Sequence, residues 1–164
     1  MSKLKMLAAA AAIAFTVAPT AHAATKQSSQ EKAVMQQEAL TQKNKALVTK
    51  AYQELFGDHD LTALDRYWAE DYIQHNPTMT DGRASVKQLL ESMGITHWPK
   101  QKVDFKRVIA EGDLVMLQVV QPKTDNSPEM VIVDMFRVEN GKIAEHWDVM
   151  QPVPAPTVNK RPMY

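Results

Sequence analysis

The chain has 164 residues, no cysteine, and 19 basic against 19 acidic residues, so its net charge is zero with histidine neutral. The absence of cysteine excludes a disulfide scaffold, thiol catalysis and cysteine-bound metals. The balanced charge offers neither the basic patch of a nucleic-acid binder nor a polybasic membrane-surface segment, and we expect no nucleic-acid partner.

The first 23 residues have the three parts of an export signal in the usual order. Lys3 and Lys5 form a positive start, residues 6–17 are an uncharged apolar run, and the closing Ala-His-Ala fits the cleavage pattern. The apolar run is too short to cross a bilayer, which needs about 20 residues. We therefore predict cleavage before Ala24, a periplasmic or secreted protein, and no membrane attachment after processing. Loss of the two lysines leaves 17 basic against 19 acidic residues, a net charge of −2.

The mature chain is long enough for one domain with its own core. Residues 24–42 are rich in Gln, Ser, Lys and Glu, and we predict a flexible polar leader or a frayed helix start there. Residues 43–152 are predicted to form the domain. Residues 153–164 begin with Val-Pro-Ala-Pro and are predicted to be an extended, proline-rich tail.

Three helices are predicted in the first half of the domain. Apolar spacing indicates a helix over residues 41–56, ended by a glycine. Asp60 is placed to cap a short second helix that reaches Trp68. Residues 71–77 are predicted to be extended, because they end in a proline and the residue before a proline avoids the helical region. A third helix is predicted over residues 83–93.

Strands are predicted in the second half, over residues 103–110, 114–120, 130–138 and 143–150. Helices followed by a run of antiparallel strands predict an α+β domain, with the helices on one face of a curved sheet. The second and third strands are apolar on both faces, whereas a sheet with one face in water would alternate. The outer face therefore needs a cover, and we predict a homodimer through it.

The pair Asn140-Gly141 predicts a two-residue hairpin turn, which sets the register of the last two strands. Asp134 then pairs with Trp147, and directly opposed residues share a face of the sheet. Beyond a bulge, the two faces would be exchanged. In the unbulged register one face holds Asp134, Trp147 and Gln151, and the other holds His146 and Asp148.

Asp134 is a candidate general base. It lies between Ile132 and Phe136, where desolvation disfavours a charged carboxylate and favours proton acceptance. The alternative is a buried aspartate with a purely structural hydrogen bond. His75 is the second candidate base, and it shares a short extended segment with the polar side chains of Tyr72 and Asn76.

His146 and Asp148 place an imidazole and a carboxylate on one strand face. With His75 they would make a three-ligand metal site, and a closed site needs further ligands. The alternative is a hydrogen-bonded pair that supports a subunit interface. We predict no metal and no other cofactor.

Four motifs together resemble one known family. They are Tyr72-Ile-Gln-His-Asn-Pro, Asp81-Gly-Arg, Val108-Ile-Ala-Glu-Gly-Asp, and the long run from Asp134 to Asp148 that contains Phe-Arg, Gly-Lys-Ile and Glu-His-Trp. The chain is similar to the SnoaL-like polyketide cyclases of the nuclear transport factor 2-like superfamily, from about Lys45 to Gln151.

This resemblance implies a cone-shaped domain in which three helices wrap a strongly curved sheet around an apolar pocket, and it implies dimers through the outer sheet face. Relatives include aldol-type cyclases, ketosteroid isomerases, epoxide hydrolases and binding-only members, so the fold does not decide the function. The chain departs from the cyclase pattern at Gln151, which stands where the resemblance places an acid/base aspartate. Asp134 and His75 remain as candidate bases.

Three functions follow as alternatives. The first is an enzyme that removes a proton next to a carbonyl, with Asp134 or His75 as the base. The second is a protein that binds a small oxygenated molecule without turnover. The third is a metal-assisted hydrolase built on His75, His146 and Asp148. In the first two, the predicted ligand-binding residues are Tyr72, Asn76, Trp147, Gln151, His146 and Asp148.

Overall fold

A computed structural model describes residues 21–125, 127–156 and 158–164. The predicted export signal lies outside these ranges except for its last three residues. The chain divides into two compact units, residues 1–34 and 35–164, and the second unit holds the sheet, the core and the site described below. Among the described helices, none is long and apolar enough to cross a membrane.

The first helix, α1 (Ala21–Tyr52), is much longer than the predicted helix over residues 41–56. The polar segment 24–42 is therefore helical in the structure, in line with its high content of Gln, Glu, Lys and Ala, which are good helix formers. A π-helical turn, η1 (Gln53–Gly57), extends α1 to the predicted end. On the α1 residues of the second unit, burial begins at Asn44, whose side-chain amide donates to the Gly112 carbonyl at 3.0 Å.

Three helices and a strand follow. Helix α2 (Ala63–Tyr67) is preceded by Asp60, which accepts hydrogen bonds from the Thr62 amide and hydroxyl at 2.9 and 2.6 Å. Trp68, predicted to end this helix, instead begins strand β1 (Trp68–Gln74). Helix α3 (Arg83–Ser92) agrees with its prediction, and the short 3₁₀ helix η2 (Ile95–His97) follows it.

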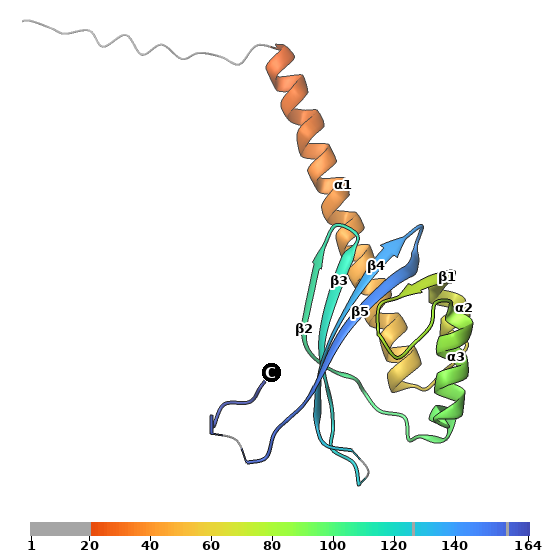
Figure 1. Ribbon diagram of the computed structural model, residues 1–164. Coiled ribbons are helices and arrows are strands. Elements are labelled where there is room, and N and C mark those ends of the chain that lie inside the picture. Colours follow the sequence, from red (N-terminus) through yellow and green to blue (C-terminus); the bar gives the residue numbers. More distant parts are fainter. Residues whose placement is uncertain (1–20, 126, 157) are drawn as a thin grey trace, which may run out of the picture. The chain divides into compact units, whose positions relative to one another are not determined.

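The sheet has five strands in the order β1-β5-β4-β3-β2 (Figure 1). Its last four strands are β2 (Asp104–Glu111), β3 (Leu114–Gln121), β4 (Met130–Glu139) and β5 (Lys142–Pro152). The α+β class and the curved sheet are confirmed. The sheet is not purely antiparallel, however, because β1 pairs in parallel with β5.

The predicted register of the last hairpin is correct at the turn and wrong beyond it. Asn140 and Gly141 have φ of 51° and 72°, as the predicted turn requires. The next pair, Val138 with Ile143, also agrees with the prediction. Ala144 is then the extra residue of a bulge, because Arg137 pairs with Glu145. The two faces of β5 are exchanged from this point, so Asp134 lies opposite Asp148 and not Trp147.

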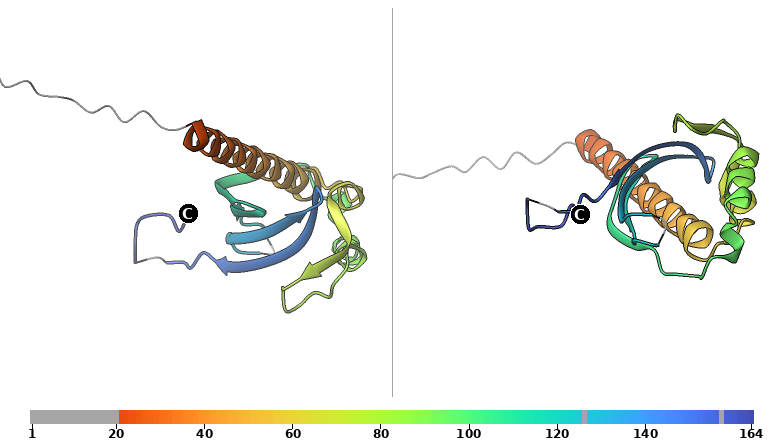
Figure 2. Two further views of the ribbon diagram at one scale, coloured as in Figure 1. Left: turned by 90° about the horizontal axis from the view of Figure 1, so that it is seen from above. Right: turned by 60° about the horizontal axis from the view of Figure 1, so that its bottom comes forward.

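The helices of the second unit lie on the concave side of the sheet (Figure 2). Their apolar side chains and those of the inner strand face form one core, in which complete burial of each leucine or isoleucine contributes about 1.5–3 kcal/mol. Its largest fully buried members are Leu55, Leu64, Ile95, Leu117 and Ile143. The core does not fill the concave side completely, and the remaining space is the candidate site.

Candidate functional site

A cavity of about 340 Å³ opens between the concave face of the sheet and the helices α1 and α3. This volume is at the lower end of the range for small-molecule pockets. Apolar and aromatic side chains make most of its wall, among them Tyr52, Phe56, Trp68 and Phe136. One group of polar side chains lies on or just beyond the neighbouring strands β1, β4 and β5, and further polar residues line the cavity elsewhere, namely Gln101, Lys102, Asp104 and Gln121.

Asp134 and His146 form the centre of this polar group. Both are almost fully buried, with exposed fractions of 5% and 7%. The His146 Nε2 lies 2.9 Å from the Asp134 Oδ1. The other carboxylate oxygen, Oδ2, accepts a hydrogen bond of 2.9 Å from the Tyr52 hydroxyl, which comes from the last residue of α1.

The hydrogen bonds around His146 determine where its protons lie. The Gln74 Oε1 accepts from the Asn76 backbone amide at 3.0 Å, which identifies this atom as the oxygen of the side-chain amide. It lies 2.8 Å from the His146 Nδ1, so this nitrogen carries a proton and donates it. The Nε2–Oδ1 contact then needs one further proton, which His146 and Asp134 share. The pair is therefore a buried acid–base couple joined by one hydrogen bond.

Asp148, the register partner of Asp134, is less enclosed. Both of its carboxylate oxygens accept from the Asn76 Nδ2, at 3.0 and 2.7 Å. The orientation of Asn76 is determined by Thr78, whose amide and hydroxyl both donate to the Asn76 Oδ1. Asp148 also lines the cavity, and it keeps lone pairs for a ligand.

Two tyrosine hydroxyls complete the polar group as donors. Burial, and then the charge of Asp134, raise the pKa of Tyr52 well above its usual value. Burial also raises the pKa of Tyr72, where hydrogen bonds from Trp68 and Gln74 act in the opposite direction. Both side chains therefore stay protonated at physiological pH.

The structure brings together five of the eight predicted site residues. Asp134, Tyr72, Asn76, His146 and Asp148 line the cavity. The other three residues, His75, Trp147 and Gln151, are not among its lining residues. For the latter two the reason is the bulge at Ala144, which turns these β5 side chains to the outer face.

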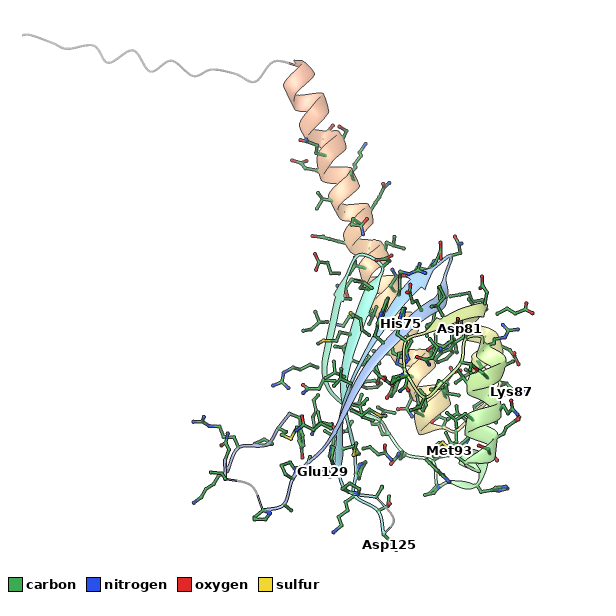
Figure 3. All side chains as sticks on the ribbon, viewed as in Figure 1. His75, Asp81, Lys87, Met93, Asp125 and Glu129 are labelled. Atoms are coloured by element: carbon green, nitrogen blue, oxygen red, sulfur yellow. The ribbon has the colours of Figure 1, made fainter. Side chains whose placement is uncertain are left out.

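His75 lies in an outer cluster that is separate from the cavity, just beyond the end of β1 (Figure 3). Its ring stacks on Trp147 at a centroid distance of 4.7 Å, and its Nε2 is 2.7 Å from the Glu145 Oε1. Glu145 also accepts from the Arg137 Nε at 2.7 Å. Hydrogen bonds from Arg137, and then from His75, lower the pKa of Glu145. These contacts account for the position of the His75 side chain without a ligand.

The expected metal-ligand set of His75, His146 and Asp148 is not brought together, because His75 is on the outer face. Ligand atoms of Asp134, His146 and Asp148 do lie within 4.8 Å of one another. Two of these three side chains share a proton in a 2.9 Å contact, which a metal ion would have to displace. The arrangement is in the first place a hydrogen-bonded acid–base cluster.

Two residues of the site were missed from the sequence. Tyr52 falls within the predicted helix over residues 41–56 and received no role, although a hydroxyl at a core position is a sign that it needs a buried partner. Gln74 received no role, because its contact with His146 depends on the parallel pairing of β1 with β5, which pairs these two residues directly.

The comparisons with known proteins agree with the fold. A model of the SnoaL-like domain matches residues 48–146. Comparison with curated protein sequences gives no match.

Three solved structures show the shared fold. IdmH of Streptomyces antibioticus, a candidate polyketide cyclase, is 23% identical with a TM-score of 0.52, over 65% of this chain and 91% of that one. A candidate ketosteroid isomerase of Kribbella flavida is 19% identical with a TM-score of 0.56, over 73% and 85%. An LEH-like epoxide hydrolase of M. tuberculosis is 18% identical with a TM-score of 0.54, over 68% and 84%. At these identities the structures are evidence of fold alone. The family model covers more than half of the chain, and on that ground the protein belongs to the SnoaL-like domain family.

Proposed function

We propose that the protein is an exported enzyme that performs acid–base chemistry on a small, mostly apolar, oxygenated molecule. The observation that carries this proposal is the Asp134–His146 couple, which shares one proton at the polar side of an apolar cavity. A base in such a cavity can remove a proton next to a carbonyl group, the step common to isomerisation, aldol closure and elimination.

The lining residues divide into three roles. Asp134 accepts the proton from the substrate carbon, and its contact with His146 lets the proton be held until it returns to the product. As the C–H bond breaks, its electron pair moves to the carbonyl oxygen, where the Tyr72 hydroxyl is a candidate hydrogen-bond donor. Asp148, held by Asn76, binds another part of the substrate. His75, the alternative base from the sequence, has no place in this scheme because it lies on the outer face.

A second function is favoured by one specific observation. Both carboxylate oxygens of Asp134 already accept hydrogen bonds, from Tyr52 and from His146. A carboxylate with these two partners is also what a structural aspartate would show in a protein that binds its ligand without turnover. Each oxygen keeps a second lone pair, so the two functions are separated by turnover and not by geometry.

The test is a comparison of two variants on a carbonyl compound found by a thermal-shift screen of ketones, lactones and aromatic acids. We expect Asp134→Asn to reduce turnover by about a hundredfold or more, the scale for loss of a general base. His75→Gln should keep turnover within about twofold, because this imidazole lies outside the cavity. Ligand binding without turnover in the native protein would favour the binding function, and equal loss in both variants would contradict the role of Asp134.

Export is proposed on the pattern of residues 1–23. We expect intact-mass measurement of material from the periplasm or the medium to give a chain that starts at Ala24. Exported protein that retains Met1 would contradict cleavage at this site.

A further inference from the structure

The polar side of the cavity is rich in acceptors, and apart from the Tyr72 hydroxyl the donors beside Asp134 and Asp148 are already engaged. The Asn76 Nδ2 is used by Asp148, and the Tyr52 hydroxyl is used by Asp134. Both nitrogens of His146 are used as well, by Gln74 and Asp134. Among the described residues, Asn76 is the one hydrogen-bond partner of the Asp148 carboxylate, so its remaining lone pairs are available to a ligand that donates.

The net charge of this region also favours a ligand that donates hydrogen bonds. Asp134 and His146 share one proton, so the pair is neutral as a whole, and the Asp148 carboxylate leaves a net charge of −1. Apart from His146, the one basic residue that lines the described cavity is Lys102. It is exposed, as is the lining carboxylate of Asp104. A ligand with one positive charge would neutralise Asp148, whereas a ligand carboxylate would place a like charge beside it.

The walls around this charge suit an organic cation. The ring of Phe136 stacks on His146 at 4.7 Å, and the ring of Tyr72 stacks on it at 6.3 Å. Tyr72 and Phe136 both line the cavity, together with Tyr52 and Trp68. Aromatic faces beside a carboxylate are the features that recognise organic ammonium groups, because the negative face of a ring attracts a cation.

Apolar side chains continue out to the solvent. Leu89, Met93, Trp98 and Met150 line the cavity and are also 40–53% exposed. Three of these four come from α3 and the segment after it, and Met93 lies at the end of α3 (Figure 3). The cavity thus has an exposed apolar rim and a buried polar side that is negative. Such a cavity orients an amphipathic ligand with its polar group inward.

From these observations we infer that the small oxygenated ligand of the proposed function also carries an amino group, bound as an ammonium inward against Asp148, with its apolar body against the rim. The inference deepens the proposed function, because it rests on the same cavity and names the class of molecule that enters it. Asp148 is then the residue that selects the ligand by charge, and Asp134 remains free for proton transfer.

The test uses three probes with the same phenylethyl body, namely 2-phenylethylamine, 2-phenylethanol and 3-phenylpropionate, titrated calorimetrically into the mature protein. We expect the amine to bind at least tenfold more tightly than the alcohol, a difference of about 1.4 kcal/mol. We expect no binding of the carboxylate at millimolar concentration. Stronger binding of the alcohol or the carboxylate, or no binding of the amine, would overturn the inference.

Two matched variants identify the carboxylate responsible. Asp148→Asn should remove the advantage of the amine over the alcohol, and Asp104→Asn, the same change at the exposed lining carboxylate, should leave it within twofold. An advantage that persists in Asp148→Asn would overturn the assignment. If Asp148→Asn does not fold, the order of the three binding affinities on the native protein still tests whether the cavity prefers an amine. Failure of the proposed function can be distinguished from failure of this inference. It would appear as no turnover of any carbonyl compound, whatever the order of the three binding affinities.

Discussion

At the scale of single residues, the site depends on shared hydrogen bonds. Substitution of Asp134 is expected to remove the most important of them. Its two oxygens are the hydrogen-bond partners of two buried groups, the Tyr52 hydroxyl and the His146 Nε2. A buried polar group left without a partner costs about 1–3 kcal/mol. A substitution that removes the proton acceptor and keeps the hydrogen bonds can therefore be compared with one that removes both.

We expect Asp134→Asn to change the free energy of unfolding by less than about 1 kcal/mol, because asparagine can accept from Tyr52 and donate to a neutral His146. Asp134→Ala leaves both groups unpaired and should cost at least about 2 kcal/mol. Urea denaturation of both variants measures this difference. Equal loss in the two would show that the carboxylate charge, and not the number of hydrogen bonds, stabilises the domain.

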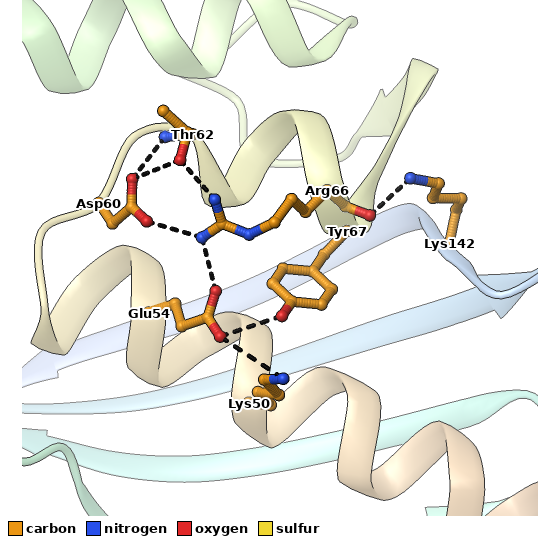
Figure 4. Close-up of polar contacts among 7 residues, drawn as sticks. All are labelled: Lys50, Glu54, Asp60, Thr62, Arg66, Tyr67 and Lys142. Carbon is orange, nitrogen blue, oxygen red and sulfur yellow. Dashed lines mark hydrogen bonds and ion pairs between the residues drawn. The ribbon is translucent and has the colours of Figure 1, made fainter.

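At the scale of elements, a polar network links α2 to η1, the turn that extends α1, and to the last hairpin (Figure 4). Arg66 of α2 contacts Glu54 at 2.6 Å and Asp60 at 2.7 Å. Tyr67 donates to Glu54 at 3.0 Å, and the Lys142 Nζ donates to the Arg66 carbonyl at 2.5 Å. The network is half-exposed, so we regard it as a link that orients α2 and not as a main source of stability.

The network predicts a specific acid response. Hydrogen bonds from Thr62, and then from Arg66, lower the pKa of Asp60 from 3.8 to about 2. A lowered pKa in the folded state means stability that is present above pH 4 and lost as the pH falls towards 2. Between pH 5 and pH 2, the native protein should lose more unfolding free energy than Asp60→Asn. The difference should stay below about 1 kcal/mol, because the side chain is 39% exposed.

Urea denaturation at both pH values measures this loss, with Asp125→Asn, on the β3–β4 loop, as the control. An Asp60→Asn variant with the same acid sensitivity as the native protein would mean that Asp60 does not carry the effect.

Elements that depend on local pattern were predictable from the sequence, and those that depend on long-range pairing were not. The helix over residues 83–93 and the four antiparallel strands are predicted by the spacing of apolar residues and by the glycines that end these elements. The structure contains them. The parallel pairing of β1 with β5 joins segments about 70 residues apart and has no local signal. The bulge at Ala144 is a single inserted residue without glycine, yet it decides which β5 side chains enter the cavity. The sequence therefore indicated which residue types form the site more reliably than it indicated which face of the sheet each of them occupies.

At the scale of the whole molecule, the outer face of the sheet is the feature that the site does not explain. Register partners on neighbouring strands share a face, and one such row is Ile109, Met116, Met135 and Trp147, from β2 to β5. Val149, two residues further along β5, is 70% exposed. In the described residues no helix of the second unit covers this side (Figure 2). An exposed apolar row of this kind is a candidate interaction site.

We propose that a second copy of the chain covers the outer face, and the last prediction follows from this. Light scattering at micromolar concentration should give twice the mass of the mature chain. Val149→Lys should give a monomer, because two copies would have to bury two unpaired charges where they now bury valines, and an unpaired buried charge is costly. Val158→Lys changes a fully exposed valine in the tail and should leave the dimer intact. A native protein that stays monomeric at 100 micromolar, or a dimer that survives Val149→Lys, would show that this face is not the interface.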